Sequence, residues 1–336
     1  GGPYKVYTPF WRALVAMGEP RSPLPAPTRL TAFPGNVSTE DLSDWSLLPV
    51  RPDWAGGLAA EWTPGEAGAN RRLDDFLSGA IDGYAEGRDF PGIRSTSRLS
   101  PHLAHGEISP FQIWHAVRGL KSASPGDAGK FLAELAWREF SWHLLFHFPH
   151  LPTGNFNPRF DAFEWRDDGK SLHLWQRGLT GYPIVDAGMR ELWRTGWMHN
   201  RVRMVVASFL VKHLLTDWRE GERWFWDTLV DADPANNAAS WQWVAGSGAD
   251  AAPYFRVFNP VLQGEKFDPK GVYVRAFVPE LAKLPDRFLH RPWEADAATL
   301  SSAGVKLGAT YPVAVVDHQE ARQRALAIYN ATRGDE

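Results

Sequence analysis

The sequence DADPANNAASWQW, residues 231–243, decides the fold of this chain. Asp233 stands where a side chain caps the first turn of a helix, and Pro234 stands at the first helical position, where a missing N–H costs nothing. Asn236 and Asn237 follow inside the helix, although asparagine is a poor helix former that competes for backbone hydrogen bonds. The stretch therefore predicts a helix in which at least one asparagine has a ligand or a buried partner.

Segments of helical period lie on both sides of this stretch, and the alternating pattern of strands is almost absent. The predicted helical segments are Thr8–Met17 with Thr8 as its cap, Arg71–Tyr84, Pro101–His105, Pro110–Leu120, Gly129–His147, Ser171–Gln176, Ile184–Thr195, His199–Leu215, Glu222–Leu229, Pro234–Val244 and Asp317–Arg333. Ser100 and Ser109 each place a capping hydroxyl before a proline, and Gln112 completes a capping box with Ser109. The sequence predicts an all-α fold.

The region from Gly18 to about Pro64 departs from this pattern. It holds many prolines and glycines with little periodicity, as a long surface connection does. We therefore divide the chain into residues 1–63, a short helix plus a Pro/Gly-rich interdomain linker, and residues 64–336, a helical catalytic domain. The chain starts with glycine and not with methionine, so we expect that a preceding part is missing.

The composition excludes several kinds of chemistry. The chain has no cysteine, which removes disulfides, thiolate zinc sites, iron–sulfur clusters and cysteine nucleophiles. No histidine pair with metal-ligand spacing has a third ligand, so no metal is expected, and no Gly-rich phosphate loop is present. The net charge of −3 gives no global attraction to nucleic acid, so any DNA contact needs a local basic patch.

No apolar run is long enough to span a bilayer, and no secretory leader is present, so we expect a soluble intracellular protein. The 17 tryptophans exceed what a chain rich in aliphatic residues needs for its core. They fit either a helical core filled with large rings or a role in stacking and electron transfer.

A cluster of hydroxyl groups precedes Pro101 in the sequence RSTSRLS, residues 94–100. Thr96, Ser97 and Ser100 could donate hydrogen bonds to a phosphate near a helix N-terminus. Taken alone, however, a capped surface loop explains the cluster better.

Two predicted helices each carry a mixed polar and apolar face. Glu134, Trp137 and Arg138 share one face, which fits a solvated salt-bridge surface as well as a base-binding platform. Asn200 shares a face with Arg203 and with Met204, which fits an aromatic-lined pocket or a hydrogen-bonded seam between helices.

In their order, these segments closely resemble the C-terminal half of the photolyase/cryptochrome family, and specifically its microbial cyclobutane pyrimidine dimer photolyases. The matching segments are YKVYTPF at 4–10, RDFP at 88–91, TSRLS at 96–100, WREF at 137–140, TGYPIVDA at 180–187, GWMHNR at 196–201, DWREGE at 217–222, WQW at 241–243 and FRVFNP at 255–260. The resemblance implies the helical FAD-binding domain of that family without its N-terminal α/β antenna domain. An antenna chromophore of the folate or deazaflavin type is expected only with that missing domain.

The resemblance also implies roles for individual residues toward a folded FAD. The expected contacts around the phosphates are Tyr84, Thr96, Ser97, Arg98, Leu99 and Ser100. The other expected cofactor contacts are Arg138, an Arg203–Asp231 ion pair beside the isoalloxazine, Asp233 at the flavin or its ribityl chain, and Asn237 near the ring nitrogen that gains a proton. The expected electron-transfer chain is Trp241 as the proximal, Trp218 as the middle and Trp165 as the distal member.

The same resemblance implies a lesion pocket for a flipped pyrimidine dimer. The expected catalytic residues are Trp137 and Trp243 flanking the dimer, Glu134 and Asn200 hydrogen-bonding it, Met204 closing the pocket, and Asn237 at the flavin. Glu134 is the candidate for a protonated carboxyl donor. Arg88, Arg138, Arg201 and Arg256, together with Trp137 and Trp243, are expected to contact the DNA strand and to supply the local positive patch.

The implied activity is light-driven repair, in which excited reduced FAD (FADH⁻) gives an electron to the dimer and the cyclobutane bonds break, as in a carbon–carbon lyase. The expected partner is single- or double-stranded damaged DNA, bound by a monomer in the bacterial cytoplasm or nucleoid. The alternative is a cryptochrome-like flavin photosensor without repair turnover, which has no need of a lesion pocket. A (6–4) photolyase is disfavoured because that class has histidines where this chain has Asn200 and Met204. A helical DNA-binding module without a cofactor would leave the hydroxyl cluster unexplained.

Overall fold

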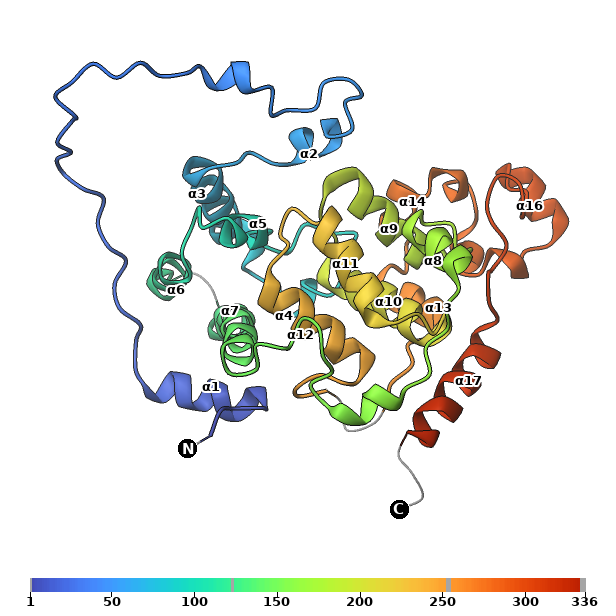
Figure 1. Cartoon of the computed structure of the whole chain (residues 1–336). Coiled ribbons are helices and arrows are strands. Elements are labelled where there is room, and N and C mark those ends of the chain that lie inside the picture. The colour runs from blue at the N-terminus through green and yellow to red at the C-terminus, as the bar shows by residue number, and fades with distance from the viewer. Residues whose placement is uncertain (1, 122–123, 252–254, 333–336) are drawn as a thin grey trace.

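Helices make up the regular structure of this chain (Figure 1), for which the computed structural model describes residues 2–121, 124–251 and 255–332. Within these ranges no strand forms, and one isolated bridge joins Leu307 to Tyr311. The prediction of an all-α fold is therefore confirmed for the described residues.

The α-helices are α1 (Tyr7–Ala16), α2 (Gly56–Glu61), α3 (Glu66–Asp75), α4 (Tyr84–Gly87), α5 (Ser100–Ala104), α6 (Pro110–Gly119), α7 (Pro125–His147), α8 (Gly169–Gln176), α9 (Pro183–Thr195), α10 (Asn200–Ser208), α11 (Trp218–Thr228), α12 (Pro234–Ala245), α13 (Pro260–Phe267), α14 (Val272–Phe277), α15 (Asp286–Leu289), α16 (Ala297–Ala303) and α17 (His318–Ala331). Short 3₁₀ segments cover Leu42–Trp45, Pro158–Ala162, Pro279–Leu281 and Pro292–Glu294, and π-helical turns cover Phe76–Ala80 and Phe209–His213.

Helix α12 begins as its sequence predicts. The Asp233 carboxylate accepts hydrogen bonds from the backbone N–H groups of Ala235 and Asn236, at 3.1 and 2.8 Å. The helix ends at Ala245, and its C-cap is Gly246, whose φ of 100° lies in the left-handed region that favours glycine. The predicted end at Val244 is thus one residue short.

Of the other predicted caps, Thr8 and Ser100 are wrong, and Ser109 is confirmed. Helix α1 starts at Tyr7 without a side-chain cap, so Thr8 lies inside the helix. Ser100 is the first residue of α5, and Leu99 occupies the cap position. The capping box of α6 is present, because Gln112 N–H donates to Ser109 Oγ at 3.2 Å and Ser109 N–H donates to Gln112 Oε1 at 2.8 Å.

Several helix boundaries differ from the predictions because local backbone chemistry overrides periodicity. The predicted segment Arg71–Tyr84 is in fact α3 and a π-helical turn, and the break before α4 falls at Gly83, whose φ is 78°. Helix α11 starts before Glu222 because Asp217 caps it, accepting from Arg219 N–H at 2.9 Å.

The α-helical period also failed to predict α2 and the helices α13 to α16. Each of these helices spans eight residues or fewer, so its apolar spacing completes too few turns to stand out. At the C-terminus, Asp317 was predicted as the first residue of the helix and is instead the cap of α17, whereas the predicted end at Arg333 lies outside the described residues.

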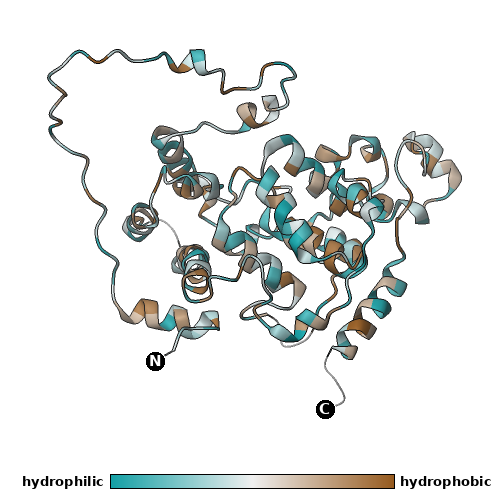
Figure 2. Ribbon diagram, in the orientation of Figure 1, coloured by the Kyte–Doolittle hydropathy of each residue, from teal (hydrophilic) through white to brown (hydrophobic). Residues whose placement is uncertain are grey.

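The connection between α1 and α2 forms an open arc outside the helical body (Figure 1). Figure 2 shows short hydrophobic stretches between hydrophilic ones along this arc. This agrees with a surface linker. However, α2 packs closely on the end of α9, since a Cβ on Gly57 would lie only 2.0 Å from the carbonyl oxygen of Arg194. Residues 56–61 thus belong physically to the helical body, although the domain boundary at residue 63 remains a prediction.

The helical body contains three hydrophobic clusters that matter for the site. The largest gathers around α9 and α10 and includes Val206 and Trp241. A second lies between α3, α6 and α7 and includes Phe131. A third joins α1, α7 and α12 and includes Tyr7 and Phe140.

Asp186, on α9, is a fully buried carboxylate that joins distant parts of the chain. It accepts hydrogen bonds from Thr180 N–H at 2.6 Å, Thr180 Oγ1 at 2.7 Å, Gly181 N–H at 3.0 Å and the hydroxyl of Tyr311 at 2.7 Å. Burial raises the pKa of Asp186, and the donors from Tyr311 and Thr180 oppose that rise. The carboxylate therefore ties the turn before α9 to the C-terminal region.

We expect Asp186→Asn to lower the free energy of unfolding by roughly 2–4 kcal/mol, because an NH₂ group replaces an acceptor where donors converge in a dry interior. Asp296→Asn is the matched control. Asp296 caps α16 at the surface through Thr299 N–H at 2.8 Å, and asparagine caps a helix as well as aspartate. Thermal unfolding followed by circular dichroism measures both variants, and equal midpoints would contradict the assignment.

Candidate functional site

A cavity of about 490 Å³ opens where the three hydrophobic clusters meet. Phe131 and Phe140 of α7 and Trp241 of α12 each bring one cluster to its wall. This volume lies within the range of pockets that bind small molecules and cofactors. Because its walls come from segments far apart in sequence, no local sequence pattern could have predicted which residues share this cavity.

Most of the predicted site residues line this one cavity. The lining includes Tyr84, Arg88, Thr96, Ser97, Arg98, Leu99, Ser100, Glu134, Trp137, Arg138, Asn200, Arg203, Met204, Asp231, Asp233, Asn237, Trp241 and Trp243. Trp165, Trp218, Arg201 and Arg256 do not line it. The cofactor and lesion residues predicted by resemblance thus share one space, whereas the outer tryptophans and two of the arginines lie elsewhere.

The hydroxyl cluster forms one wall through the loop that leads into α5. Thr96, Ser97 and Ser100 line the cavity, and the hydroxyl of Ser100 accepts a hydrogen bond from Trp197 Nε1 at 3.2 Å. Ser100 does not cap α5. The structure therefore favours an anion-binding wall over a capped surface loop.

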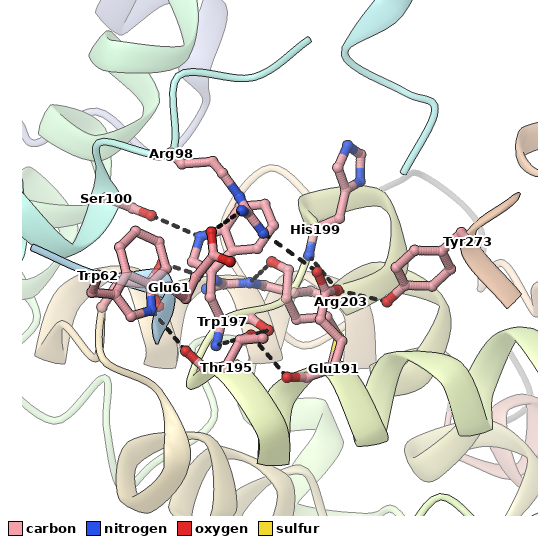
Figure 3. A network of polar contacts seen from close by, with 12 residues as sticks. Glu61, Trp62, Arg98, Ser100, Glu191, Thr195, Trp197, His199, Arg203 and Tyr273 are labelled. Atoms are coloured by element: carbon pink, nitrogen blue, oxygen red, sulfur yellow. Dashed lines mark hydrogen bonds and ion pairs between the residues drawn. The ribbon is translucent and has the colours of Figure 1, made fainter. Parts of the chain in front are cut away.

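Arg203 and Asp231 form the ion pair that the family resemblance implied, with 2.7 Å between Arg203 Nη2 and Asp231 Oδ2. Arg203 Nε also donates to the carbonyl of Met198 at 2.7 Å. The other carboxylate oxygen of Asp231 is buried without a hydrogen-bond partner. Figure 3 shows Arg203 beside Trp197. The pair thus presents a fixed cation and one free acceptor at the cavity.

Asp233 joins α12 to α7 at the cavity wall. Its Oδ2 lies 2.8 Å from Nη1 of Arg138, while Oδ1 accepts from Asn236 Nδ2 at 2.8 Å in addition to capping the helix. Asn237 donates through Nδ2 to the backbone carbonyl and side chain of Glu222, at 2.9 and 2.8 Å. Both asparagines therefore have protein partners, as expected for at least one.

Trp137 and Trp243 are half-buried at the cavity and are supported from behind. The ring of Trp137 stacks on Tyr7 of α1 at 3.8 Å between centroids and 7° between planes. Trp243 Nε1 donates to the carbonyl of Asp250 at 3.0 Å. Asn200 is exposed and Met204 half-buried, which agrees with a pocket edge and not with a seam between helices.

Glu134 differs from its prediction in one respect. Its carboxylate forms ion pairs with Arg88 and with Lys130, the latter at 2.9 Å. Burial would raise the pKa of Glu134, but the hydrogen bonds and charges of Arg88 and Lys130 outweigh burial and hold the pKa below its usual range. With these partners Glu134 is ionised, so the expectation of a protonated carboxyl donor is wrong for this arrangement.

Three of the arginines predicted to contact DNA have carboxylate partners. Arg88 pairs with Glu134, Arg138 with Asp233, and Arg201 with Asp89, whose Oδ1 lies 2.8 Å from Nη2 of that arginine. Their positive charge is therefore partly neutralised, and the local basic patch is weaker than the sequence suggested.

Trp241 is buried against helix α11. A Cβ on Gly221 would lie 2.1 Å from Cη2 of Trp241, so only glycine lets the two helices approach this closely. Trp218, one helical turn before Gly221, is fully buried and donates from Nε1 to Asn155 Oδ1 at 2.9 Å. Trp241 Nε1, in contrast, is buried without a partner.

Sequence reasoning missed Trp197, whose ring centroid lies 4.2 and 5.8 Å from the guanidinium carbons of Arg98 and Arg203. It also missed the carboxylates of Glu61 and Glu191, which contact Arg98. Trp197 stands inside the GWMHNR segment and could have been found there. Glu61 stands in the region interpreted as linker, and no local signal pointed to it.

In the described parts of the chain, no group of three or more histidine, aspartate or glutamate side chains is arranged to hold a metal ion. A search of the same residues found no helix with the length and apolar character needed to cross a bilayer.

A helical body with hydroxyls, arginines and buried carboxylates around an aromatic-walled cavity has the groups that a large, flat, anionic cofactor requires. Comparison with known proteins agrees, because residues 131–331 match the family described as the FAD binding domain of DNA photolyase. The chain belongs to the DNA photolyase family.

Its relatives include both branches of that family. A deoxyribodipyrimidine photo-lyase of Agrobacterium fabrum is 62% identical over 334 residues, which cover 99% of this chain and 70% of the relative. Cryptochrome-1 of Arabidopsis thaliana is 38% identical over 337 residues, covering 96% of this chain and 49% of the relative. The crystal structure of a class III photolyase from Agrobacterium tumefaciens superimposes with a TM-score of 0.96 at 62% identity, covering 100% of this chain and 70% of that one.

Proposed function

We propose that this chain binds FAD and, with the cofactor in its reduced FADH⁻ state, repairs cyclobutane pyrimidine dimers in DNA under light. The observation that carries the proposal is the single cavity, which is lined by the residues expected for the cofactor and by those expected for the lesion. The names of the relatives support the same activity, since the chain is 62% identical to a deoxyribodipyrimidine photo-lyase.

The residues present fit FAD. The hydroxyls of Thr96, Ser97 and Ser100 match phosphate oxygens, and the aromatic walls match a flat ring system. The buried Asp231 Oδ1 and Trp241 Nε1 have no protein partner, and a buried polar atom is costly until something bonds to it.

The residues that would hold the cofactor are Tyr84, Thr96, Ser97, Arg98, Leu99 and Ser100 at the phosphates and Arg138, Arg203, Asp231, Asp233 and Asn237 toward the flavin. When bound and reduced, FAD supplies the photoexcited electron that opens the cyclobutane ring. Asp231 orients the guanidinium of Arg203, which would lie beside the ring system. Because the side chain of Asp231 is only 2% exposed, solvent screens the attraction between the two charges less than at the surface.

From the same cavity wall, Trp137 and Trp243 would stack against the flipped lesion, and Met204 would close over it. The amide of Asn200 can donate to a pyrimidine carbonyl and so stabilise the charge that develops there. Glu134, ionised beside Arg88 and Lys130, would accept a hydrogen bond from a pyrimidine N–H.

The proposed partner is damaged DNA, single- or double-stranded, bound by a monomer. Arg88, Arg138, Arg201 and Arg256 would lie along the lesion-bearing strand. Arg88, Arg138 and Arg201 already have carboxylate partners. The phosphates must therefore compete for these guanidinium groups, and binding should weaken steeply with added salt.

The direct test of the proposal is repair of an oligonucleotide that carries one thymine dimer. FAD-loaded, chemically reduced protein should restore the dimer to thymines under blue or near-UV light and should leave it intact in the dark. Chromatography of the oligonucleotide measures the product. A normal flavin spectrum without repair would contradict the proposal and favour a photosensor. A protein that takes up no flavin would favour a helical module without a cofactor.

Trp137→Ala should weaken binding of the dimer about tenfold while flavin content stays normal, because stacking on an aromatic ring contributes about 1–3 kcal/mol per base. Trp193→Ala is the matched control, since Trp193 is 65% exposed on α9 and does not line the cavity. Fluorescence anisotropy with the lesion oligonucleotide measures both affinities. Equal affinities for the two variants would contradict the assignment of Trp137 as a residue that stacks on the dimer.

Trp241→Phe should strongly slow photoreduction of the oxidised flavin but spare repair by protein that has been chemically reduced. Phenylalanine keeps an aromatic ring against Gly221 yet is far harder to oxidise than tryptophan. Trp142→Phe, at an exposed position on α7, is the control. Transient absorption of the flavin measures the rate, and unchanged photoreduction in Trp241→Phe would remove this residue from the electron-transfer chain.

A further inference from the structure

Arg98 stands in the loop of residues 96–100 with a φ of 52°, a left-handed backbone conformation that side-chain-bearing residues rarely adopt. Its guanidinium is held by carboxylates from two other parts of the chain, Glu61 at the end of α2 and Glu191 on α9 (Figure 3). We propose that Glu61 and Glu191 form a clamp on Arg98 that positions the cofactor-binding loop, so that α2, within the connecting region, is a positioning element of the FAD site. This inference rests on the proposed function, because it takes residues 96–100 as the wall that receives the FAD phosphates.

Glu61 reaches Arg98 because α2 is docked firmly on the helical body. Trp62, the next residue, donates from Nε1 to the carbonyl of Thr195 at 2.7 Å. Arg72 of α3 donates to the carbonyl of Glu61 at 3.1 Å and packs over the Trp62 ring at 4.6 Å. The position of the Glu61 carboxylate is thus fixed by contacts with both α3 and α9.

Glu191 supplies the second half of the clamp from the buried side. Its Oε1 lies 3.6 Å from Nη2 of Arg98, and its Oε2 accepts from the hydroxyl of Tyr273 at 2.6 Å and from His199 N–H at 3.3 Å. Only 3% of Glu191 is exposed, so an arginine nearby offsets the cost of burying its charge.

The clamp is connected to the cavity wall through an aromatic ring. The guanidinium carbon of Arg98 lies 4.2 Å from the centroid of Trp197, and Trp197 Nε1 donates to the hydroxyl of Ser100. Two anchors at Arg98 and a third at Ser100 therefore fix both the left-handed residue and the end of the loop. Without these anchors the loop would relax toward commoner backbone conformations, and its hydroxyls would leave the positions that a phosphate needs.

The coupling must act in both directions. If the anchored loop binds FAD more tightly, then bound FAD must stabilise the anchored loop and with it the docked α2. FAD should therefore protect the amides of residues 56–61 from hydrogen exchange, although α2 contributes no residue to the cavity wall.

The test compares FAD release from the 336-residue chain and from Glu61→Gln and Glu191→Gln variants, measured by the fluorescence of freed flavin. At a pH of about 8, above the pKa of about 7 of Glu191, each variant should release FAD about tenfold faster, as expected for loss of one hydrogen-bonded charge pair. The control is Glu280→Gln, which breaks an ion pair of 2.7 Å with Arg190 of the same helix α9. The side chains of Arg190 and Glu280 are each 22% exposed, which is close to the 18% of Arg98 and the 24% of Glu61. Its FAD release should stay within about twofold of the parent, because the pair lies outside the cavity wall.

Two further measurements separate positioning from general loss of structure. In an Arg98→Gln background, Glu61→Gln should have no additional effect, because the two residues act as one unit. Burial raises the pKa of Glu191 to about 7 against the opposing influence of Tyr273, Arg98, His199 N–H and Arg203. Its charge therefore forms as the pH rises through 7, and FAD release should become slower over that interval in the parent but not in Glu191→Gln.

The outcomes distinguish this inference from the function on which it rests. A parent chain that binds no FAD would overturn the proposed function itself. A parent that binds FAD, with Glu61→Gln and Glu191→Gln releasing it as slowly as Glu280→Gln, would overturn only the clamp. If the variants unfold, hydrogen exchange of the parent decides the matter: equal exchange of residues 56–61 with and without FAD would overturn the role of α2.

Discussion

The rest of the site depends on the hydrogen bonds and the ion pair that the Asp233 carboxylate forms. One oxygen caps α12 and holds Asn236, while the other binds Arg138 of α7. The same side chain thus caps one helix of the cavity wall and pairs with the helix packed against it. A buried carboxylate is costly unless its lone pairs have donors, and here the donors come from both helices. Satisfying this one charge therefore fixes the spacing of α7 and α12.

That spacing explains why the hydrophobic clusters meet around a cavity without collapsing into it. Polar groups at the wall, such as Arg203, Asp231 and the loop of residues 96–100, resist burial against apolar side chains. Behind this wall the helices pack tightly, as the close approach of Gly221 to the Trp241 ring illustrates. A cavity with both polar groups and aromatic rings in its wall suits a cofactor that carries both phosphates and a flat ring.

Local chemistry made much of the fold predictable. Ser109, Asp233 and Asp317 start helices because short polar side chains next to the first turn satisfy free backbone N–H groups. The prediction failed where neighbours decided the outcome. The Ser-Pro step at Ser100 indicates a cap, yet the hydroxyl bonds to Trp197, which lies 97 positions further along the chain. The family resemblance favours a protonated Glu134, and the nearby charges of Arg88 and Lys130 hold it ionised.

The sequence by itself determined the helical class, most helix positions and the residue types that a flavin and a lesion require. It could do so because capping, periodicity and ordered motifs are local properties, read over a few residues at a time. Only the tertiary structure decided that these residues share one cavity, that Asp231 keeps an unpaired oxygen there, and that α2 contacts the loop of residues 96–100 through Glu61. Those facts depend on which distant segments meet, and the energy of a buried charge is set by its neighbours in space and not by its neighbours in sequence.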